Sequence, residues 1–165
     1  MENRLIYKTF NIKVDELNKL VIFKGNIGII KKKFSGKDLI FFKKKIFFIS
    51  KLSYINFLSY ININYLGLQY GYYIEINFIG LGSRFLKFKN YLLLKLGYGH
   101  YIKYIIPKSI IVIGYKRTLI IYGIDLQEVM VMAKKIREFK KPNIYKGKGI
   151  QLEGEIINFK IGKQK

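Results

Sequence analysis

The residues best suited to binding chemistry lie near the end of the chain, in residues 142–150, PNIYKGKGI. Glycine lets backbone N–H groups approach a phosphate closely, lysine supplies compact positive charge, and tyrosine can stack on a base or ribose. From Lys134 to Lys165 there are ten basic residues and three acidic ones. The segment therefore suits a nucleic-acid backbone, although composition alone also allows a solvated, flexible end.

Residues that could perform catalysis or hold a metal ion are scarce. The chain has no cysteine, and its single histidine, His100, lies in a glycine-flanked turn without nearby carboxylates. The three acids between residues 76 and 152, Asp125, Glu128 and Glu138, have the spacing of capping and helix-surface charges. We therefore predict no enzyme activity, no cofactor and no metal site, and expect His100 to structure its turn or lie beside RNA.

Two further patterns have ordinary structural explanations. Residues 80–82 read Gly-Leu-Gly, but Phe85 stands where a dinucleotide-binding motif needs its third glycine, so we interpret them as a bulge or close approach between strands. The lysine runs 31–33 and 43–45 are interpreted as charged strand ends and turns.

The charge balance indicates a polyanionic partner. Lysine and arginine number 31 against 10 aspartate and glutamate, a net charge of +21. Such a charge repels itself in a compact body and is neutralised by a polyanion. Part of the lysine excess follows from codon bias, because six residue types with A/T-rich codons (Ile, Lys, Tyr, Phe, Asn and Met) make up 98 of 165 residues. Half of the chain is hydrophobic, enough for a folded core.

The first third of the chain predicts a small meander followed by a helix. Apolar runs predict strands at residues 10–14, 20–24, 27–34 and 46–50, with a turn at Gly25-Asn26. Apolar residues then recur every three or four positions, at Tyr54, Phe57, Leu58, Ile61, Tyr65 and Leu68. This spacing predicts a helix that covers the sheet.

The second part repeats this order. Strands are predicted at residues 73–81, 84–89, 91–96, 101–106, 110–114 and 119–123. A helix follows from about 125 to 139, with an apolar stripe of Leu126, Val129, Met130, Ala133 and Ile136. The segment 140–165 lacks an apolar period, so it is expected to be extended and mobile unless a partner fixes it.

These elements predict an α+β fold of two small units. Each unit is an antiparallel-rich β-sheet with one packing helix, and an extended basic C-terminal tail follows. The expected boundaries are 1–68 for the N-terminal unit, 69–139 for the C-terminal unit and 140–165 for an RNA-binding tail.

Residues 142–150 resemble the C-terminal signature of the bacterial-type large-subunit ribosomal protein six family, in which Tyr-Lys-Gly-Lys-Gly precedes an aliphatic residue. The order and spacing of residues 79–84, 96–100 and 121–137 are also similar to the family, so the resemblance covers about residues 66–150. The first 65 residues agree only in element order. The chain departs from the family at Ser83, where a tyrosine is frequent, and at residues 99–101, where the family commonly has Ser-His-Pro.

The resemblance implies two similar α+β domains and a surface on large-subunit ribosomal RNA, near the sarcin-ricin loop and the base of the stalk. Together with the charge pattern, it predicts a structural ribosomal protein that supports translation, with rRNA and neighbouring ribosomal proteins as partners, no small-molecule substrate and no membrane insertion. The predicted RNA-binding residues are Arg84, His100, Lys103, Arg137, Lys140, Lys141, Tyr145, Lys146, Gly147, Lys148 and Gly149.

Two other functions are compatible with parts of the sequence. The uncharged residues 52–74 are long enough to cross a bilayer, so a membrane-associated basic protein is one alternative, although three Asn and six Tyr disfavour insertion. A small nuclease is the other, but a carboxylate cluster for its metal is missing.

The residue bias and the bacterial-type motif favour a particular location. With no N-terminal import pattern visible in residues 1–16, they predict an organelle-encoded protein of the mitochondrial ribosome. A relict plastid or an A/T-rich bacterium would produce a similar sequence.

Overall fold

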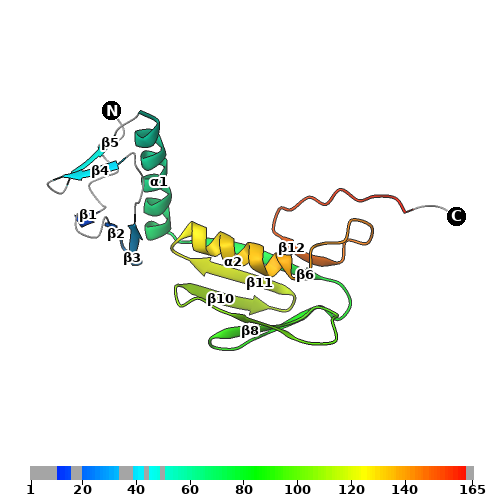
Figure 1. Ribbon diagram of the computed structural model, residues 1–165. Coiled ribbons are helices and arrows are strands. Elements are labelled where there is room, and N and C mark those ends of the chain that lie inside the picture. The colour runs from blue at the N-terminus through cyan, green and yellow to red at the C-terminus, as the bar shows by residue number, and fades with distance from the viewer. Residues whose placement is uncertain (1–10, 16–19, 34–38, 43–44, 49–50, 163–165) are drawn as a thin grey trace. The chain divides into compact units, whose positions relative to one another are not determined.

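The computed structural model describes residues 11–15, 20–33, 39–42, 45–48 and 51–162. The chain divides into two compact units, of which the first is Met1–Gly71 with Ile124–Leu126 and the second is Tyr72–Gly123 with Gln127–Lys165. Each unit combines antiparallel strands with one helix (Figure 1). The predicted α+β class is confirmed.

The first unit follows the predicted meander with one addition. Strands β1 (Asn11–Asp15), β2 (Leu20–Lys24) and β3 (Ile29–Lys33) form one antiparallel sheet. A separate hairpin joins β4 (Leu39–Phe42) to β5 (Lys45–Phe48). Strand β4 is not among the predicted strands, because a short run of apolar residues has no period that marks it as a strand.

Some predicted residues of this unit lie outside the described part of the chain. They are Lys43 and Lys44 of the second lysine run, and the strand ends at Phe10, Phe34 and residues 49–50.

Helix α1 (Lys51–Gln69) packs against this meander. Its residues Phe57, Ile61 and Leu68 are buried with Val21, Phe23 and Ile30. Leu58 and Tyr65 of the predicted stripe are half-buried. No helix in the described residues has the length and apolar character needed to cross a membrane.

The turn between β2 and β3 requires glycine at position 25. The Gly25 amide donates to the Gly28 carbonyl at 3.1 Å, and the Ile27 amide donates to the Leu68 carbonyl at 3.2 Å. A Cβ at Gly25 would lie 2.6 Å from the Leu68 Cβ. The predicted Gly25-Asn26 turn is therefore also the contact that fits the meander against the end of α1.

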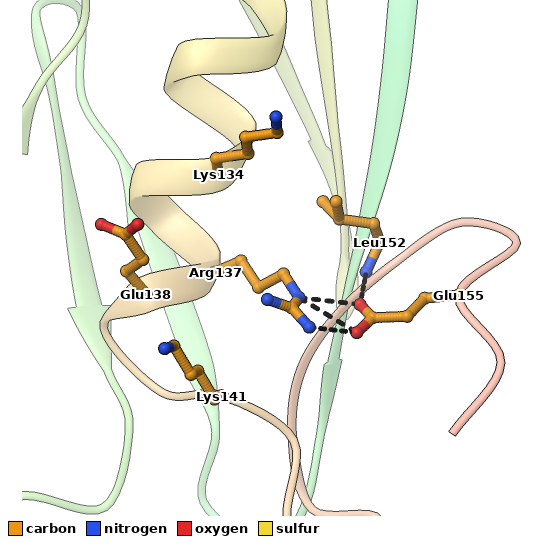
Figure 2. Close-up of a pocket in the computed structure, with 6 residues that line it drawn as sticks. All are labelled: Lys134, Arg137, Glu138, Lys141, Leu152 and Glu155. Carbon is orange, nitrogen blue, oxygen red and sulfur yellow. Dashed lines mark hydrogen bonds and ion pairs between the residues drawn. The ribbon is translucent and has the colours of Figure 1, made fainter. Parts of the chain in front are cut away.

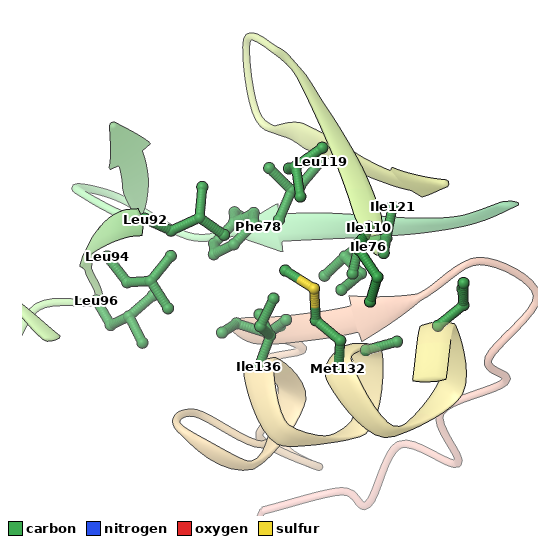
Figure 3. Packing of buried hydrophobic residues seen from close by; sticks show 14 residues of the cluster. Ile76, Phe78, Leu92, Leu94, Leu96, Ile110, Leu119, Ile121, Met132 and Ile136 are labelled. Carbon is green, nitrogen blue, oxygen red and sulfur yellow. The ribbon is translucent and has the colours of Figure 1, made fainter. Parts of the chain in front are cut away.

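The second unit contains two antiparallel sheets and one helix. The larger sheet has the order β10 (Ile110–Tyr115), β11 (Thr118–Gly123), β6 (Tyr72–Ile79) and β12 (Gly149–Leu152). The smaller sheet has the order β7 (Arg84–Lys87), β8 (Tyr91–Lys95) and β9 (Ile102–Ile105). Helix α2 (Leu126–Glu138) supplies the remaining part of the core (Figure 3).

The core of this unit draws side chains from both sheets and from α2. Residues Phe78, Leu94 and Ile136 come from three different elements and point toward one another (Figure 3). The helical stripe at Val129, Ala133 and Ile136 is confirmed. At Met130 the prediction is wrong, because Met132 is buried and Met130 is 38% exposed. Positions 129, 132, 133 and 136 lie on one face of the helix. Met132, and not Met130, therefore packs into the core.

Part of the C-terminal segment, which the sequence predicts to be extended and mobile without a partner, is fixed by the larger sheet. Strand β12 pairs antiparallel with β6, with Gly149 opposite Ile79 and Leu152 opposite Ile76. The Ile150 side chain is fully buried. Four residues are too few to show an apolar period, but an open sheet edge supplies backbone partners for them.

Candidate nucleic-acid interface

The loop formed by residues 142–148 is held in shape by Asn143. The Asn143 side-chain oxygen accepts hydrogen bonds from the Tyr145 amide at 2.8 Å and the Lys146 amide at 3.2 Å. The Asn143 backbone N–H donates to the Lys148 backbone carbonyl at 2.9 Å. The Asn143 backbone carbonyl accepts from the Gly147 backbone N–H at 2.8 Å. The loop therefore presents Tyr145, Lys146 and Lys148, all exposed, from a backbone with its own hydrogen bonds.

The two glycines of this loop let the chain pack closely on itself. Gly149 has φ +151°, and a Cβ there would lie 2.6 Å from the Pro142 Cα and 2.7 Å from the Lys141 carbonyl oxygen. Gly147 has φ +66°, and a Cβ there would lie 3.0 Å from the Phe159 ring. Both glycines are buried. The sequence pattern predicts that these glycines let the backbone approach a phosphate, and that role stays a prediction. The structure adds an intramolecular reason for glycine at both positions.

Lys148 lies beside the loop that leads into β7. Because Gly149 pairs with Ile79, the next residues outward on the two strands are neighbours. A Cβ built at Gly80 would lie 3.5 Å from the Lys148 Cβ. Arg84, exposed, begins β7 directly after this loop. The structure thus places the 80–84 loop next to the 142–148 loop, although some 60 residues separate them in the sequence.

Lys140 and His100 belong to one cluster around Tyr98. The Lys140 ammonium donates to the Leu96 carbonyl and lies 5.6 Å from the centre of the Tyr98 ring. The Tyr98 hydroxyl donates to the Phe139 carbonyl at 3.0 Å. The His100 ring lies 6.2 Å from the Tyr98 ring at an interplanar angle of 20°. Lys140 therefore fastens the end of α2 to the β8–β9 turn, while His100 is exposed.

Arg137 forms an ion pair with Glu155 rather than facing solvent alone (Figure 2). The Arg137 Nε donates to both carboxylate oxygens, at 3.1 and 2.8 Å, and the Leu152 amide donates to the same carboxylate at 3.2 Å. The hydrogen bond from Arg137 holds the pKa of Glu155 below its usual range, and the same bond raises the pKa of Arg137. The pair ties the segment after β12 to the last turn of α2.

Glu155 is a site residue that sequence reasoning missed. It is one of three acids in the basic segment from Lys134 to Lys165, and this rarity was the available signal. Lys134 and the exposed Lys141 line one pocket together with Arg137 and Glu155 (Figure 2).

Lys103 and Arg84 share one face of the smaller sheet. Lys103 lies opposite Leu93 on β8, and Arg84 lies opposite Lys95. The Lys103 ammonium is 4.6 Å from the centre of the Tyr91 ring. Among the predicted site residues, Tyr145, Lys146 and Lys148 therefore form one exposed group on the 142–148 loop. Arg84 and Lys103 form another on this sheet.

A surface of this composition is typical of a protein that binds nucleic acid. Within the described residues, no group of three or more His, Cys, Asp or Glu could hold a metal ion.

Comparison with known proteins identifies the family. Residues 86–153 match the family model described as Ribosomal protein L6. Large ribosomal subunit protein uL6 of Nautilia profundicola is 34% identical over 155 residues, which cover 90% of this chain and 87% of that protein. The chain therefore belongs to the ribosomal protein L6 family.

Other relatives match over a shorter length. The uL6 protein of Thermotoga maritima is 39% identical over 100 residues, 60% of this chain and 54% of that protein. That of Ruegeria pomeroyi is 41% identical over 100 residues, 60% of this chain and 56% of that protein. In these alignments the chain spans about half the length of the curated relatives it matches. Membership of this family of structural ribosomal proteins supports the prediction that the chain is not an enzyme.

Proposed function

We propose that this chain is a structural constituent of the large ribosomal subunit. It binds large-subunit rRNA near the sarcin-ricin loop and the stalk base and contacts neighbouring ribosomal proteins, so that it supports translation. Family membership and the net charge of +21 support this proposal.

The observation that carries the proposal is the geometry of the 142–148 loop, which belongs to the proposed RNA-binding segment 140–165. The Asn143 hydrogen bonds fix its backbone before any partner arrives. Lys146 and Lys148 then neutralise phosphates at a small cost in ordering entropy, and Tyr145 supplies a ring for a base or ribose. Contacts of this kind follow the shape and backbone of RNA more than its base sequence.

The test is the salt dependence of binding to an rRNA fragment that contains the sarcin-ricin region. With about four phosphate contacts, the logarithm of the binding constant should fall with the logarithm of salt concentration with a slope near −3 to −4. The double variant Lys146→Glu/Lys148→Glu should bind about ten-fold or more weakly, and the slope should drop to about half, since two contacts are lost.

The matched control is Lys31→Glu/Lys33→Glu in the first unit. These lysines are exposed, have the same spacing and change the net charge equally. An equal loss of affinity in both variants would contradict a specific role of the loop.

We also propose that the protein works in the ribosome of a mitochondrion, on the basis of the A/T-type residue bias. The comparisons give bacterial relatives. Detection of the chain in ribosomal particles from purified mitochondria supports this location. Its recovery from plastid or bacterial particles alone contradicts it.

A further inference from the structure

The outer face of the β7–β8–β9 sheet collects three cations from three strands. Arg84 lies opposite Lys95, and Leu93 lies opposite Lys103. Residues directly opposite each other in an antiparallel sheet share a face, and so do residues two apart on a strand. Arg84, Lys95 and Lys103 therefore share one face, and all three are exposed. The alternate residues Leu92 and Leu94 point into the core (Figure 3).

Aromatic rings stand among these cations. The Phe88 and Tyr91 rings are stacked with centres 4.6 Å apart and planes 13° apart. The Lys103 ammonium is 4.6 Å from the Tyr91 ring centre, and the Lys95 ammonium is 5.9 Å from the Tyr101 ring centre. Phe88 is 42% exposed and Tyr101 is 55% exposed. Each lysine is thus paired with a ring, and two rings keep accessible surface.

The charge of this face favours an anionic occupant, although the exposed Leu86 and Ile105 share the face. Residues 84–108 contain six basic residues and no acidic one. The outer face of the larger sheet differs in charge, because it carries the acidic residue Glu75. Glu75 lies opposite Ile120, which in turn lies opposite the exposed Ile113. An apolar protein partner on the β7–β8–β9 face would remove three cations from water without partners, which is costly.

We propose that this face is a second RNA-binding surface that accepts a strand with unpaired bases. Arg84, Lys95 and Lys103 neutralise its phosphates, and bases stack on the rings of Phe88 and Tyr101. A duplex holds its bases in the helical stack, so it could meet the cations but not the rings. The inference rests on the proposed role in rRNA binding, but it uses none of the residues of the 142–148 loop.

Base stacking can be tested by fluorescence, because the chain has no tryptophan. Phe88→Trp creates a single reporter on the proposed face. A short single-stranded RNA should quench its emission, and a duplex of the same length should quench it much less. Tyr115→Trp is the control, since Tyr115 is 66% exposed with the Lys116 ammonium 5.1 Å from its ring centre but belongs to the larger sheet. The inference is wrong if both reporters respond equally, if duplex quenches Phe88→Trp as strongly, or if neither RNA quenches it.

Phosphate contacts are tested with the triple variant Arg84→Gln/Lys95→Gln/Lys103→Gln. For single-stranded RNA each lost contact should reduce the magnitude of the salt slope by about 0.7, so three should reduce it by about 2. The control is the triple variant Lys31→Gln/Lys33→Gln/Lys116→Gln, which changes the net charge by the same amount. Its three lysines are exposed. A circular dichroism melt checks folding, and Lys95→Gln alone replaces the triple variant if that variant unfolds. An unchanged slope contradicts the proposal.

The two RNA surfaces are separated by combining variants. Lys146→Glu/Lys148→Glu in the Phe88→Trp background should weaken binding to the rRNA fragment but leave quenching by the short strand intact. If the loop variant has no effect on rRNA binding while quenching persists, the proposed function of the loop fails and the inference stands. If quenching is lost with the loop variant, the sheet face is not an independent surface and the inference fails.

Discussion

At the scale of single residues, the described basic side chains near the C-terminal end differ in whether they are engaged within the chain. Arg137 and Lys140 make hydrogen bonds within the chain, to Glu155 and to the Leu96 carbonyl. Lys146 and Lys148 are exposed on a loop whose backbone is already ordered. Because a guanidinium held by a carboxylate must lose that partner before it binds a phosphate, Arg137 is better suited to positioning the C-terminal segment.

The Arg137–Glu155 pair predicts a pH-dependent contribution to stability. The pKa of Glu155 is lowered in the folded state, so the pair stabilises the protein above the unfolded pKa of about 4.3. This stabilisation is lost as the pH falls through the folded pKa. In urea titrations at neutral pH, Glu155→Gln should unfold about 1 kcal/mol more easily than the parent chain. The difference should shrink as the pH falls below the unfolded pKa and through the lowered folded pKa. A constant difference across pH would contradict the assignment.

At the scale of elements, β12 decides how the basic segment is presented. Its pairing with β6 sets Lys148 beside the 80–84 loop, and the Ile150 amide donates to the Lys140 carbonyl at 2.9 Å. Gly149 permits both contacts, because it combines φ +151° with backbone atoms less than 3 Å from the site of a Cβ. The strand is thus the link between α2 and the loop.

Gly149→Ala should displace β12. Backbone strain and overpacking each cost about 1–3 kcal/mol, so a loss of roughly 2–6 kcal/mol in the free energy of unfolding is expected. Hydrogen exchange of the Ile150 amide should accelerate. Gly154→Ala is the control: Gly154 also has a positive φ, +74°, but nothing lies within 4 Å of a Cβ there, so only the strain should remain. Equal losses in the two variants would show that the close approach at Pro142 is unimportant.

At the scale of the whole molecule, the net positive charge lowers the stability of the folded chain and raises its affinity for an anionic partner. A net charge of +21 on 165 residues repels itself, and salt screens that repulsion. The same salt weakens RNA binding, because binding releases counterions from the RNA, and this release gains less entropy when the salt concentration is higher. Stability and affinity should therefore respond to salt in opposite directions.

This opposition can be measured on one sample. Raising sodium chloride from about 0.05 to 0.3 M should increase the melting temperature of the free protein by about 2–4 °C, equivalent to roughly 1 kcal/mol. Over the same range the affinity for the rRNA fragment should fall. Sucrose at equal osmolality serves as the uncharged control and should leave RNA affinity nearly unchanged. A melting temperature that falls with salt would contradict the role of self-repulsion.

The local pattern of the sequence determined the α+β class, the two helices, most strands and the exposed lysines of the 142–148 loop, because period, turn residues and charge act over a few neighbouring positions. Only the tertiary structure decided that Glu155 pairs with Arg137, that Met132 and not Met130 is buried, and that β12 joins β6. The alignment of Arg84, Lys95 and Lys103 on one face likewise depends on strand register. Register and long-range pairing arise from contacts between segments far apart in the chain, and no local pattern specifies which distant residue a side chain will meet.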